Sequence, residues 1–567
     1  MINFNEGVKG NINVFINNHK LEMSKVIKYL GVFVDENLDF NSQVQSASGK
    51  ARSAQNKINI LLRGRRGIPL EIAINLYKAL VRSHWEHAIA AWSVLNDSQV
   101  GELEKVQASS LKSILGVFKS SSNSAVEVIA NVVPVRVRMN EICCREWIRI
   151  MSMEDHHPLK KKLLSDQPFY VGNRGSPLGY MKHLTRDLQR TMEEGRLSVR
   201  VQGKASPEAI LDKVEVQEVQ IFSQAIGNSK SRSKVQSELA RSEFDSFYEG
   251  LPDNALTVFT DGSVLGAACI GRGGYGVVIH RKNEIPQVVS GSVGRMTDNV
   301  SCEVQAIIVA LKLAVERCVS DRSIGYVHIF TDCQSAIDIF TKQKNSFQNL
   351  EEFRGVWECL RSLKERGVPL NLIWVPGHAD ITGNEKADRA AKNGCLIQMD
   401  SDQTEFISEQ VLFGWVKEKS LKRWGEMWRR SESGNWTRFF LGEVGKKLLL
   451  PQDRDTGVTY VRALLNNAAV ADNMFRMGLA DSSDCSCGEG RETVEHLLME
   501  CSSEAGGRGK LLEEVGNIWM EKKVSGGLQF NLHTILNPFS NPKLNSADAS
   551  FIMNYVFIFL RGLSKKL

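Results

Sequence analysis

Residues 253–396 alternate between the apolar patterns of strands and helices, and this alternation restricts the possible folds more than any other feature of the chain. Three successive runs, ALTVF, YGVVIH and PQVVSGSVG, have the composition of β-strands. The run SCEVQAIIVALKLAVERC has helical length and is apolar on nearly all sides, as expected for burial against a sheet. Two more strands, YVHIF and LNLIW, are each followed by a helical pattern. The region predicts a mixed five-stranded sheet with helices, in an α+β or α/β multidomain chain with mainly helical flanks.

Acidic side chains lie where these predicted elements begin or end. Asp261 follows the first strand in a Gly-Ser bend, Glu303 lies in the first turn of the long helix, and Asp332 ends a later strand. Asp388 lies on the last helix, ten residues after His378. A single acid at such a place is usually a turn former or a helix cap. Four acids gathered together repel one another and lose hydration unless cations neutralise them, and an all-carboxylate set selects Mg²⁺ or Mn²⁺.

The segments FTDGS, SCEVQAIIVAL, IFTDCQSAI and WVPGHADITGNEKADRAA together resemble the type 1 ribonuclease H domain in their order, spacing and structural setting. The resemblance implies that the metal-binding acids are Asp261, Glu303, Asp332 and Asp388, and that the loop residue His378 assists proton transfer and product release. It also supplies candidate substrate-binding residues, which are Gly262, Ser263, Asn299, Gln334 and Asn384.

The activity implied by the resemblance is endonucleolytic hydrolysis of the RNA strand in an RNA–DNA hybrid. One ion, held by Asp261 and Asp388, would activate water, and a second, held by Asp261, Glu303 and Asp332, would stabilise the leaving 3′ oxygen. Recognition of RNA would rest on 2′-hydroxyl contacts in the minor groove. The alternative is a catalytically inactive nucleic-acid-binding remnant, and the sequence leaves this alternative open.

The flanking regions indicate the origin of such a domain. The runs VIKYLGVFVDENLDFNSQV and LYKALVRSHWEHAIAAW resemble the end of the palm and the thumb-like region of reverse transcriptases from non-LTR (LINE-type) retrotransposons. The polymerase catalytic region and its adjacent Asp-Asp pair are missing from this sequence, so we expect no reverse transcriptase activity from this chain alone. We therefore interpret the chain as a C-terminal fragment of such a polyprotein, with other retroelement proteins as candidate partners. The expected regions are a truncated polymerase part (1–155), a connector (156–250), ribonuclease H (251–398) and a helical C-terminal region (405–567).

A cysteine and histidine cluster lies in the C-terminal region, in CSCGEGRETVEHLLMEC. Cys485, Cys487, His496 and Cys501 form a set that suits tetrahedral Zn²⁺ and is similar to the C-terminal Cys/His motif of LINE-type proteins. Its first gap is shorter and its middle gap longer than in a retroviral zinc knuckle, so a helix with free thiols is the alternative. The other cysteines lack the density of a secreted scaffold, which favours an intracellular protein, nuclear or cytoplasmic.

The composition adds weaker constraints. The 71 Lys and Arg against 65 Asp and Glu give a formal charge of +6, which favours polyanionic partners such as the hybrid. No signal peptide or unbroken apolar run of membrane-spanning length occurs, so we expect no membrane partner, and no motif suggests a small-molecule cofactor. Trp424 and Trp428 share one helix face, which favours core packing over stacking on nucleic acid. The basic run LLRGRRG is equally consistent with a solvated loop and a phosphate contact.

Overall fold

The chain divides into two compact units. The computed structural model describes residues 15–63, 67–165, 170–171, 174–194, 197–199, 217–221, 234–266, 271–341, 350–397, 405–407, 409–521, 530–542, 544–564 and 566–567. The terminal unit comprises Met1–Cys143, Tyr170–Tyr180 and Glu418–Leu567. The sheet unit comprises Cys144–Phe169 and Met181–Lys417.

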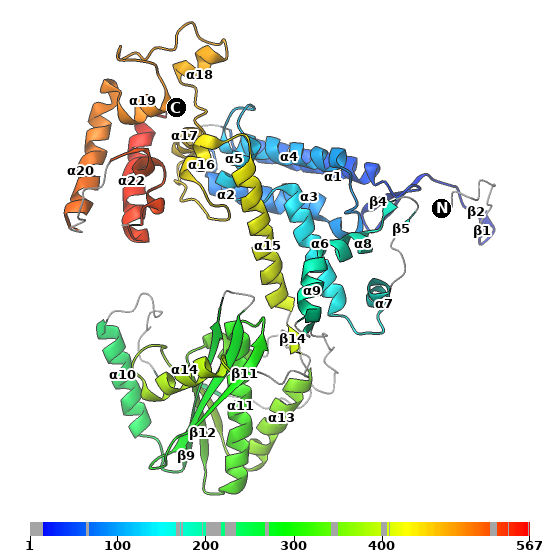
Figure 1. Ribbon diagram of the computed structural model, residues 1–567, viewed down its shortest axis with the longest axis vertical. Helices are drawn as coiled ribbons and strands as arrows, with labels where there is room; N and C mark the ends of the chain where they lie inside the picture. The colour runs from blue at the N-terminus through cyan, green and yellow to red at the C-terminus, as the bar shows by residue number, and fades with distance from the viewer. Residues whose placement is uncertain are drawn as a thin grey trace. The chain divides into compact units, whose positions relative to one another are not determined.

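The sheet unit is built on a six-stranded sheet with the order β11-β10-β9-β12-β13-β8. Figure 1 labels β9, β11 and β12 of this sheet. Strands β9, β10 and β11 are antiparallel neighbours, whereas β12, β13 and β8 run parallel to β9. The strands are β7 (Leu197–Val199), β8 (Gln217–Val219), β9 (Ala255–Leu265), β10 (Arg272–Arg281), β11 (Gln287–Arg295), β12 (Tyr326–Thr331), β13 (Leu370–Trp374) and β14 (Glu405–Ile407). The helices are α7 (Pro158–Leu164), α9 (Arg186–Glu194), α10 (Lys234–Glu249), α11 (Asn299–Ser320), α12 (Gln334–Thr341), α13 (Leu350–Glu365) and α14 (Thr382–Gly394).

Two apolar layers cover the sheet. One face packs against α11, α12 and α13 through a core that includes Ile329, Leu311 and Leu360. The other face packs against α10 and α14 through Phe244 and Ala387. Helix α14 comes so close to β10 that a Cβ on Gly276 would lie 2.1 Å from a backbone oxygen of α14, so only glycine fits there. This contact holds the helix that carries Asp388 against the sheet.

The predicted strand and helix order of the central region is confirmed, but the sheet is wider than expected. The sixth strand, β8, and helix α10 come from residues 156–250, which the sequence suggested were a loosely packed connector. Phe244 of α10 packs in an aromatic cluster with Phe259 and Phe330 of the two central strands. Apolar burial of this kind stabilises the fold by about 1.5–3 kcal/mol for each large side chain. Strand β8 and helix α10 therefore belong to the core of the sheet unit.

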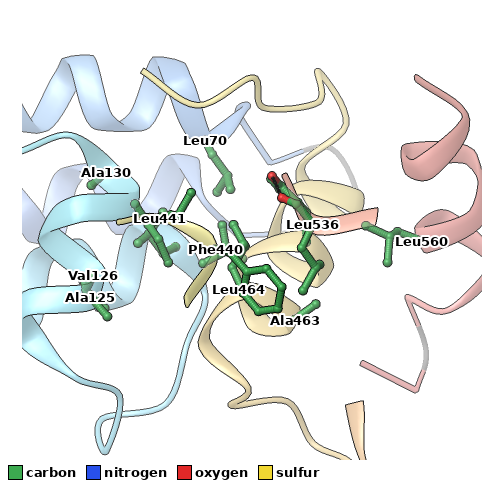
Figure 2. Close-up of a cluster of buried hydrophobic side chains, with 14 of the residues drawn as sticks. Leu70, Ala125, Val126, Ala130, Phe440, Leu441, Ala463, Leu464, Leu536 and Leu560 are labelled. Carbon is green, nitrogen blue, oxygen red and sulfur yellow. Dashed lines mark hydrogen bonds between the residues drawn. The ribbon is translucent and has the colours of Figure 1, made fainter. Parts of the chain in front are cut away.

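The terminal unit joins both flanks of the chain in one hydrophobic core. Figure 2 shows Leu70 and Ala125 from the N-terminal flank beside Phe440 and Leu464 from the C-terminal flank. Hydrogen bonds cross the same junction, including one from Arg462 Nε to a backbone oxygen of the N-terminal flank at 2.9 Å. The sequence suggested two separate regions because no local pattern reveals which apolar faces meet. The flanks instead form a single unit, although the residues of the sheet unit lie between them in the sequence.

The elements of the terminal unit are short strands and many helices. The strands are β1 (Phe15–Ile16), β2 (His19–Lys20), β3 (Val26–Tyr29), β4 (Val32–Asp35), β5 (Tyr170–Val171) and β6 (Arg174–Gly175). The helices are α1 (Asn41–Leu61), α2 (Leu70–Leu76), α3 (Arg82–Glu86), α4 (Asp97–Leu115), α5 (Asn123–Ala130), α16 (Asn435–Phe440), α17 (Arg454–Leu465), α18 (Ala471–Arg476), α19 (Val494–Met499), α20 (Ala505–Glu521), α21 (Leu532–Leu536) and α22 (Ser546–Gly562). Helices α6 (Val135–Met151), α8 (Pro177–Leu184) and α15 (Glu409–Arg430) have residues in both units.

Of the two expectations about the flanks, the structure tests the packing of the tryptophans. Trp424 and Trp428 are 2% and 1% exposed, and the Trp428 indole donates a hydrogen bond to the Leu441 carbonyl oxygen at 2.8 Å, which confirms core packing. Residues 64–66 of the basic run LLRGRRG lie outside the described residues. Within the part of the chain that the structure describes, each helix is too short or too polar to cross a membrane.

Candidate active site

Asp261 lies inside the central strand β9. It is 6% exposed and pairs with Gly276 of β10. The sequence suggested a bend at this point, but β9 continues to Leu265 because β10 supplies antiparallel partners along its whole length. The carboxylate is therefore fixed by a regular strand in the middle of the sheet.

Glu303 reaches the same place from α11, which packs against β9. A Cβ on Gly262 would lie 2.3 Å from the backbone nitrogen of Glu303, so glycine is needed for this close approach. Helix α11 begins earlier than expected, because the side chain of Asp298 caps it by accepting from the backbone N–H of Ser301 at 2.8 Å. Glu303 is thus one turn inside the helix, not in its first turn. Asn299 is exposed at the first position of α11.

Asp332 completes a cluster of three acids. One ligand oxygen from each of Asp261, Glu303 and Asp332 lies within 4.8 Å of the others. The backbone oxygen of Asp332 accepts a hydrogen bond from the Trp374 indole at 3.1 Å, and its carboxylate accepts one from the Asn384 amide at 3.5 Å. Asn384 is 3% exposed, so the structure gives it a contact with an acid and little surface for substrate.

Burial and mutual repulsion make the ionised form of these acids unfavourable. Burial, followed by the charges of Asp332 and Asp388, raises the pKa of Asp261 to about 8. Burial and then Asp261 raise the pKa of Glu303 to about 10, against a backbone hydrogen bond from Gly262. Burial also raises the pKa of Asp332, although Asn384 and His378 oppose the shift. Among the described residues, Glu303 Oε2 is buried with no hydrogen-bond partner. A free oxygen within a set of hard, mutually repelling donors fits a divalent cation.

Asp388 stands apart from the other acids. Its carboxylate is bound by Lys392, one helical turn later on α14, at 2.6 Å. It is near enough to raise the pKa of Asp261, yet it is not one of the three acids whose oxygens converge. Sequence reasoning did not include Lys392, although a base four residues after an acid on a helix is a recognisable ion-pair signal.

The loop between β13 and α14 presents His378 to solvent. His378 and Asp380 have φ angles of 54° and 56°, in the left-handed region that non-glycine residues seldom adopt. Backbone of this kind concentrates at functional sites. His378 lowers the pKa of the Asp332 carboxyl, so its imidazole lies near the acids.

The remaining substrate-binding candidates lie around the acids. Ser263 is half-buried on β9, and its carbonyl oxygen accepts from the Cys395 thiol at 3.2 Å. Gln334 is exposed at the first position of α12. Its amide donates a hydrogen bond to Glu218 of β8 at 3.0 Å. No sequence signal identified Glu218, because the contact depends on the unexpected sixth strand.

The predicted zinc ligands also converge, in the terminal unit. One ligand atom from each of Cys485, Cys487, His496 and Cys501 lies within 4.8 Å of the others. The sulfurs of Cys485 and Cys501 are 3.8 Å apart, which equals the spacing of about 3.8 Å for two sulfurs bound tetrahedrally to zinc. The Cys487 sulfur lies 3.2 Å from His496 Nε2, and the other ring nitrogen faces Glu500 at 3.4 Å.

Local structure explains how the unusual spacing can work. A tight turn at Gly488, with φ of 80°, brings Cys485 and Cys487 to the same side. The backbone N–H of Glu489 beside Cys487 lowers the pKa of that thiol to about 7, whereas burial raises the pKa of Cys485 to about 11. A thiol that ionises near neutral pH and a histidine whose second ring nitrogen faces a carboxylate are both suited to a structural zinc site.

Comparison with known proteins identifies the family of the sheet unit's core. A family model described as RNase H matches residues 253–396. The ribonuclease H of Rhizobium etli is 30% identical over 148 residues, covering 24% of this chain and 90% of that protein. Through this segment the chain belongs to the ribonuclease H family. A solved structure, RNase H1 from Halobacterium salinarum NRC-1, has 21% identity and a TM-score of 0.19, covering 25% of this chain and 96% of that one.

A second relative shows the wider origin of the chain. The RNA-directed DNA polymerase from mobile element jockey of Drosophila funebris is 24% identical over 157 residues, which is 28% of this chain. The match spans 17% of the length of that polymerase. The chain is a retrotransposon-derived protein that contains a ribonuclease H domain.

Proposed function

We propose that the chain is a divalent-metal-dependent endoribonuclease that cuts the RNA strand of an RNA–DNA hybrid. The observation that carries the proposal is the convergence of Asp261, Glu303 and Asp332 within 4.8 Å in a domain of the ribonuclease H family. The raised pKa values of these acids mean that a cation would be needed to keep them ionised together.

The chain's own residues would hold Mg²⁺ or Mn²⁺ as a pair. Asp261, Glu303 and Asp332 offer the converged oxygens, and Asp388 offers a further carboxylate at the edge of the site once Lys392 releases it. When bound, paired cations activate water and stabilise the leaving 3′ oxygen in such reactions. Glu303 Oε2 has no competing partner among the described residues, and Asn384 steadies the Asp332 carboxylate.

His378 would handle protons at the edge of the site. His378 is exposed on a loop with left-handed backbone and lowers the pKa of Asp332. It can therefore contact a phosphate group that faces solvent. Histidine exchanges protons readily near neutral pH, which suits protonation of a departing 3′ oxygen. The neighbouring Ser263 backbone, Asn299 and Gln334 would contact the hybrid, with RNA distinguished by its 2′-hydroxyls.

Cleavage of a labelled RNA–DNA hybrid by the purified chain tests the proposal. We expect cutting of only the RNA strand, with Mg²⁺ or Mn²⁺, and none of an RNA–RNA duplex. Asp261→Asn should abolish the reaction while leaving the protein folded. If the folded wild-type chain binds the hybrid but cuts it with neither metal, the chain is a nucleic-acid-binding remnant and the enzyme proposal is wrong.

We also propose that Cys485, Cys487, His496 and Cys501 bind a structural zinc ion. The supporting observation is the 3.8 Å separation of two buried sulfurs within a four-ligand group. Metal analysis of protein purified without chelator should find one zinc per chain, and Cys487→Ser should lose it. Unchanged zinc content in that variant would exclude this cluster as the site.

A further inference from the structure

The sixth strand brings an acid to the edge of the proposed active site. Strand β8 runs parallel to β13, with Glu218 opposite Leu372 and Val219 opposite Ile373. Side chains alternate across a sheet, so neighbouring residues of β8 face opposite layers. Val219 packs with Ile373 in the layer of α10 and α14, whereas Glu218 shares the face of Leu372, which α12 covers. This register directs the Glu218 carboxylate toward α12.

Glu218 accepts a hydrogen bond from Gln334, which is the first residue of α12 and lies two positions after the acid Asp332. Gln334 Nε2 donates to Glu218 Oε1 at 3.0 Å and more weakly to Asp338 Oδ1 at 3.5 Å. Both neighbours are carboxylates, which only accept hydrogen bonds when ionised. The NH₂ arm of the Gln334 amide must therefore face them, independently of how the two amide atoms are assigned. The carbonyl arm is directed away from both acids.

We propose that Glu218 is a positioning residue that fixes the Gln334 amide so that its carbonyl oxygen accepts a hydrogen bond from a ribose 2′-hydroxyl. The inference rests on the proposed hybrid-cleaving function and adds a basis for its RNA specificity. A 2′-hydroxyl can donate this hydrogen bond, whereas deoxyribose has no hydroxyl at the 2′ position. A freely rotating Gln334 amide would present its NH₂ group as often as its carbonyl oxygen. It would therefore discriminate less strictly between RNA and DNA. The specificity contact therefore depends on a strand outside the segment 253–396 that matches the family.

Hybrids with a single altered ribose test this role. One RNA nucleotide at a time, around the cleaved bond, is replaced by its 2′-fluoro or 2′-deoxy form, neither of which can donate a hydrogen bond. Affinity is measured in an Asp261→Asn background, and KM and kcat are measured with Asp261 intact. The variants are Glu218→Ala, Glu218→Gln and Gln334→Ala. Val219→Ala is the matched control, because it weakens the packing of β8 while leaving the carboxylate in place.

In the protein with Glu218 unchanged, we expect alteration of one ribose to lower the affinity for the hybrid about three- to tenfold. This is the effect of losing one hydrogen bond. Glu218→Ala should abolish this preference and raise KM on the natural hybrid with little change in kcat. Glu218→Gln should retain the preference, because its amide oxygen still accepts from Gln334. In a Gln334→Ala background, Glu218→Ala should have no further effect. Val219→Ala should keep the preference.

Other results overturn the inference. Retention of the preference in Glu218→Ala, or its loss in Glu218→Gln, would show that acceptance by residue 218 is not what orients Gln334. Loss in Val219→Ala would assign the effect to strand packing. If the wild-type chain neither binds nor cuts the hybrid, the proposed function itself fails. If Glu218→Ala cleaves normally and keeps the wild-type ribose preference, only the present inference fails.

Discussion

The acid cluster of the sheet unit and the Cys/His cluster of the terminal unit each gather ligand atoms within 4.8 Å, but they do so in different ways. Asp261 lies on a strand, Glu303 on a helix and Asp332 directly after another strand, so the sheet must fold before they meet. The four Cys/His ligands lie within residues 485–501, around one turn and one short helix. The first site is held by a core that exists without metal, whereas the second is a local segment that metal would hold. This is the difference expected between the proposed catalytic metal and the proposed structural zinc.

The largest expected effect is the loss of cleavage in Asp261→Asn. Cations contribute several kcal/mol to such reactions, so loss of a shared ligand should slow hydrolysis at least about a hundredfold. The sheet unit should be equally or more stable to heat, because one buried, repelled carboxyl is removed. Initial rates and thermal melting measure the two effects. Asp245→Asn, at an exposed ion pair on α10, is the control and should change neither. Marked destabilisation by Asp261→Asn would contradict the view that the sheet holds this site without metal.

The second effect is destabilisation of the terminal unit when zinc is removed. Structural zinc contributes many kcal/mol to folding, so Cys487→Ser should cost at least about 3 kcal/mol. Cys485 and Cys501 belong to the core shared with α2, α4 and α5, so protection from hydrogen exchange should fall in those helices too. Strands β9 and β12 should keep their protection. Cys359→Ser, a half-buried thiol of the sheet unit, serves as the control. Exchange confined to residues 485–501 would show that the zinc segment and the shared core are independent.

A third effect concerns a buried acid that has no cluster around it. Glu127 of α5 accepts a hydrogen bond from Gln107 at 2.8 Å, and burial raises its pKa from 4.5 to about 8. Between these values the unfolded chain has lost a proton that the folded chain keeps, so stability falls as pH rises from about 4.5 to about 8. The slope is at most about 1.4 kcal/mol per pH unit. Urea unfolding across this range should show that Glu127→Gln reduces the slope, to which other buried acids such as Asp261 also contribute, and that the exposed Glu443→Gln does not. An unchanged slope in Glu127→Gln would mean that another group carries it.

The smallest effect sharpens the description of the acid cluster. Lys392 would compete with the proposed cation for Asp388, so Lys392→Ala should tighten Mn²⁺ binding. Exposed ion pairs contribute about 0.2–1 kcal/mol, which limits the gain to about fivefold. Calorimetric titration with Mn²⁺ measures it directly. Arg389→Ala, next to Asp388 but directed to the Glu385 carbonyl oxygen, should leave the affinity unchanged. Equal or weaker binding in Lys392→Ala would remove Lys392 from this role.

The sequence predicted those parts of the molecule that local patterns encode. Asp261 and Asp332 follow recognisable apolar runs, Glu303 lies at the start of another, and the structure brings the three side chains together. Trp424 and Trp428 could be assigned to a core because both lie on one helix face. The Cys/His ligands are close in sequence, and the structure brings their ligand atoms together, although the spacing alone also allowed a helix with free thiols.

Two of the features that sequence reasoning missed depend on long-range contacts, and a third is a local ion pair on one helix. Strand β8 has only three residues and no distinctive pattern, so its pairing with β13 could not be read from the chain. The ion pair that separates Asp388 from the other acids is a side-chain contact that motif matching does not consider. The shared core of the flanks required knowledge of which apolar faces meet, such as those of Leu70 and Leu464.

The arrangement of the terminal unit has a consequence for how the protein is made. About 270 residues separate Cys143 from Glu418, the ends of its two largest segments. At a synthesis rate of about 5–20 residues per second, the N-terminal helices wait about 15–55 seconds on the ribosome before their C-terminal partners emerge. Leu70, Ala125 and Val126 would be open to solvent or to a chaperone during that interval. The ribonuclease H domain can complete its own core in the meantime, so the sheet unit and the flanks complete their folds at different moments of translation.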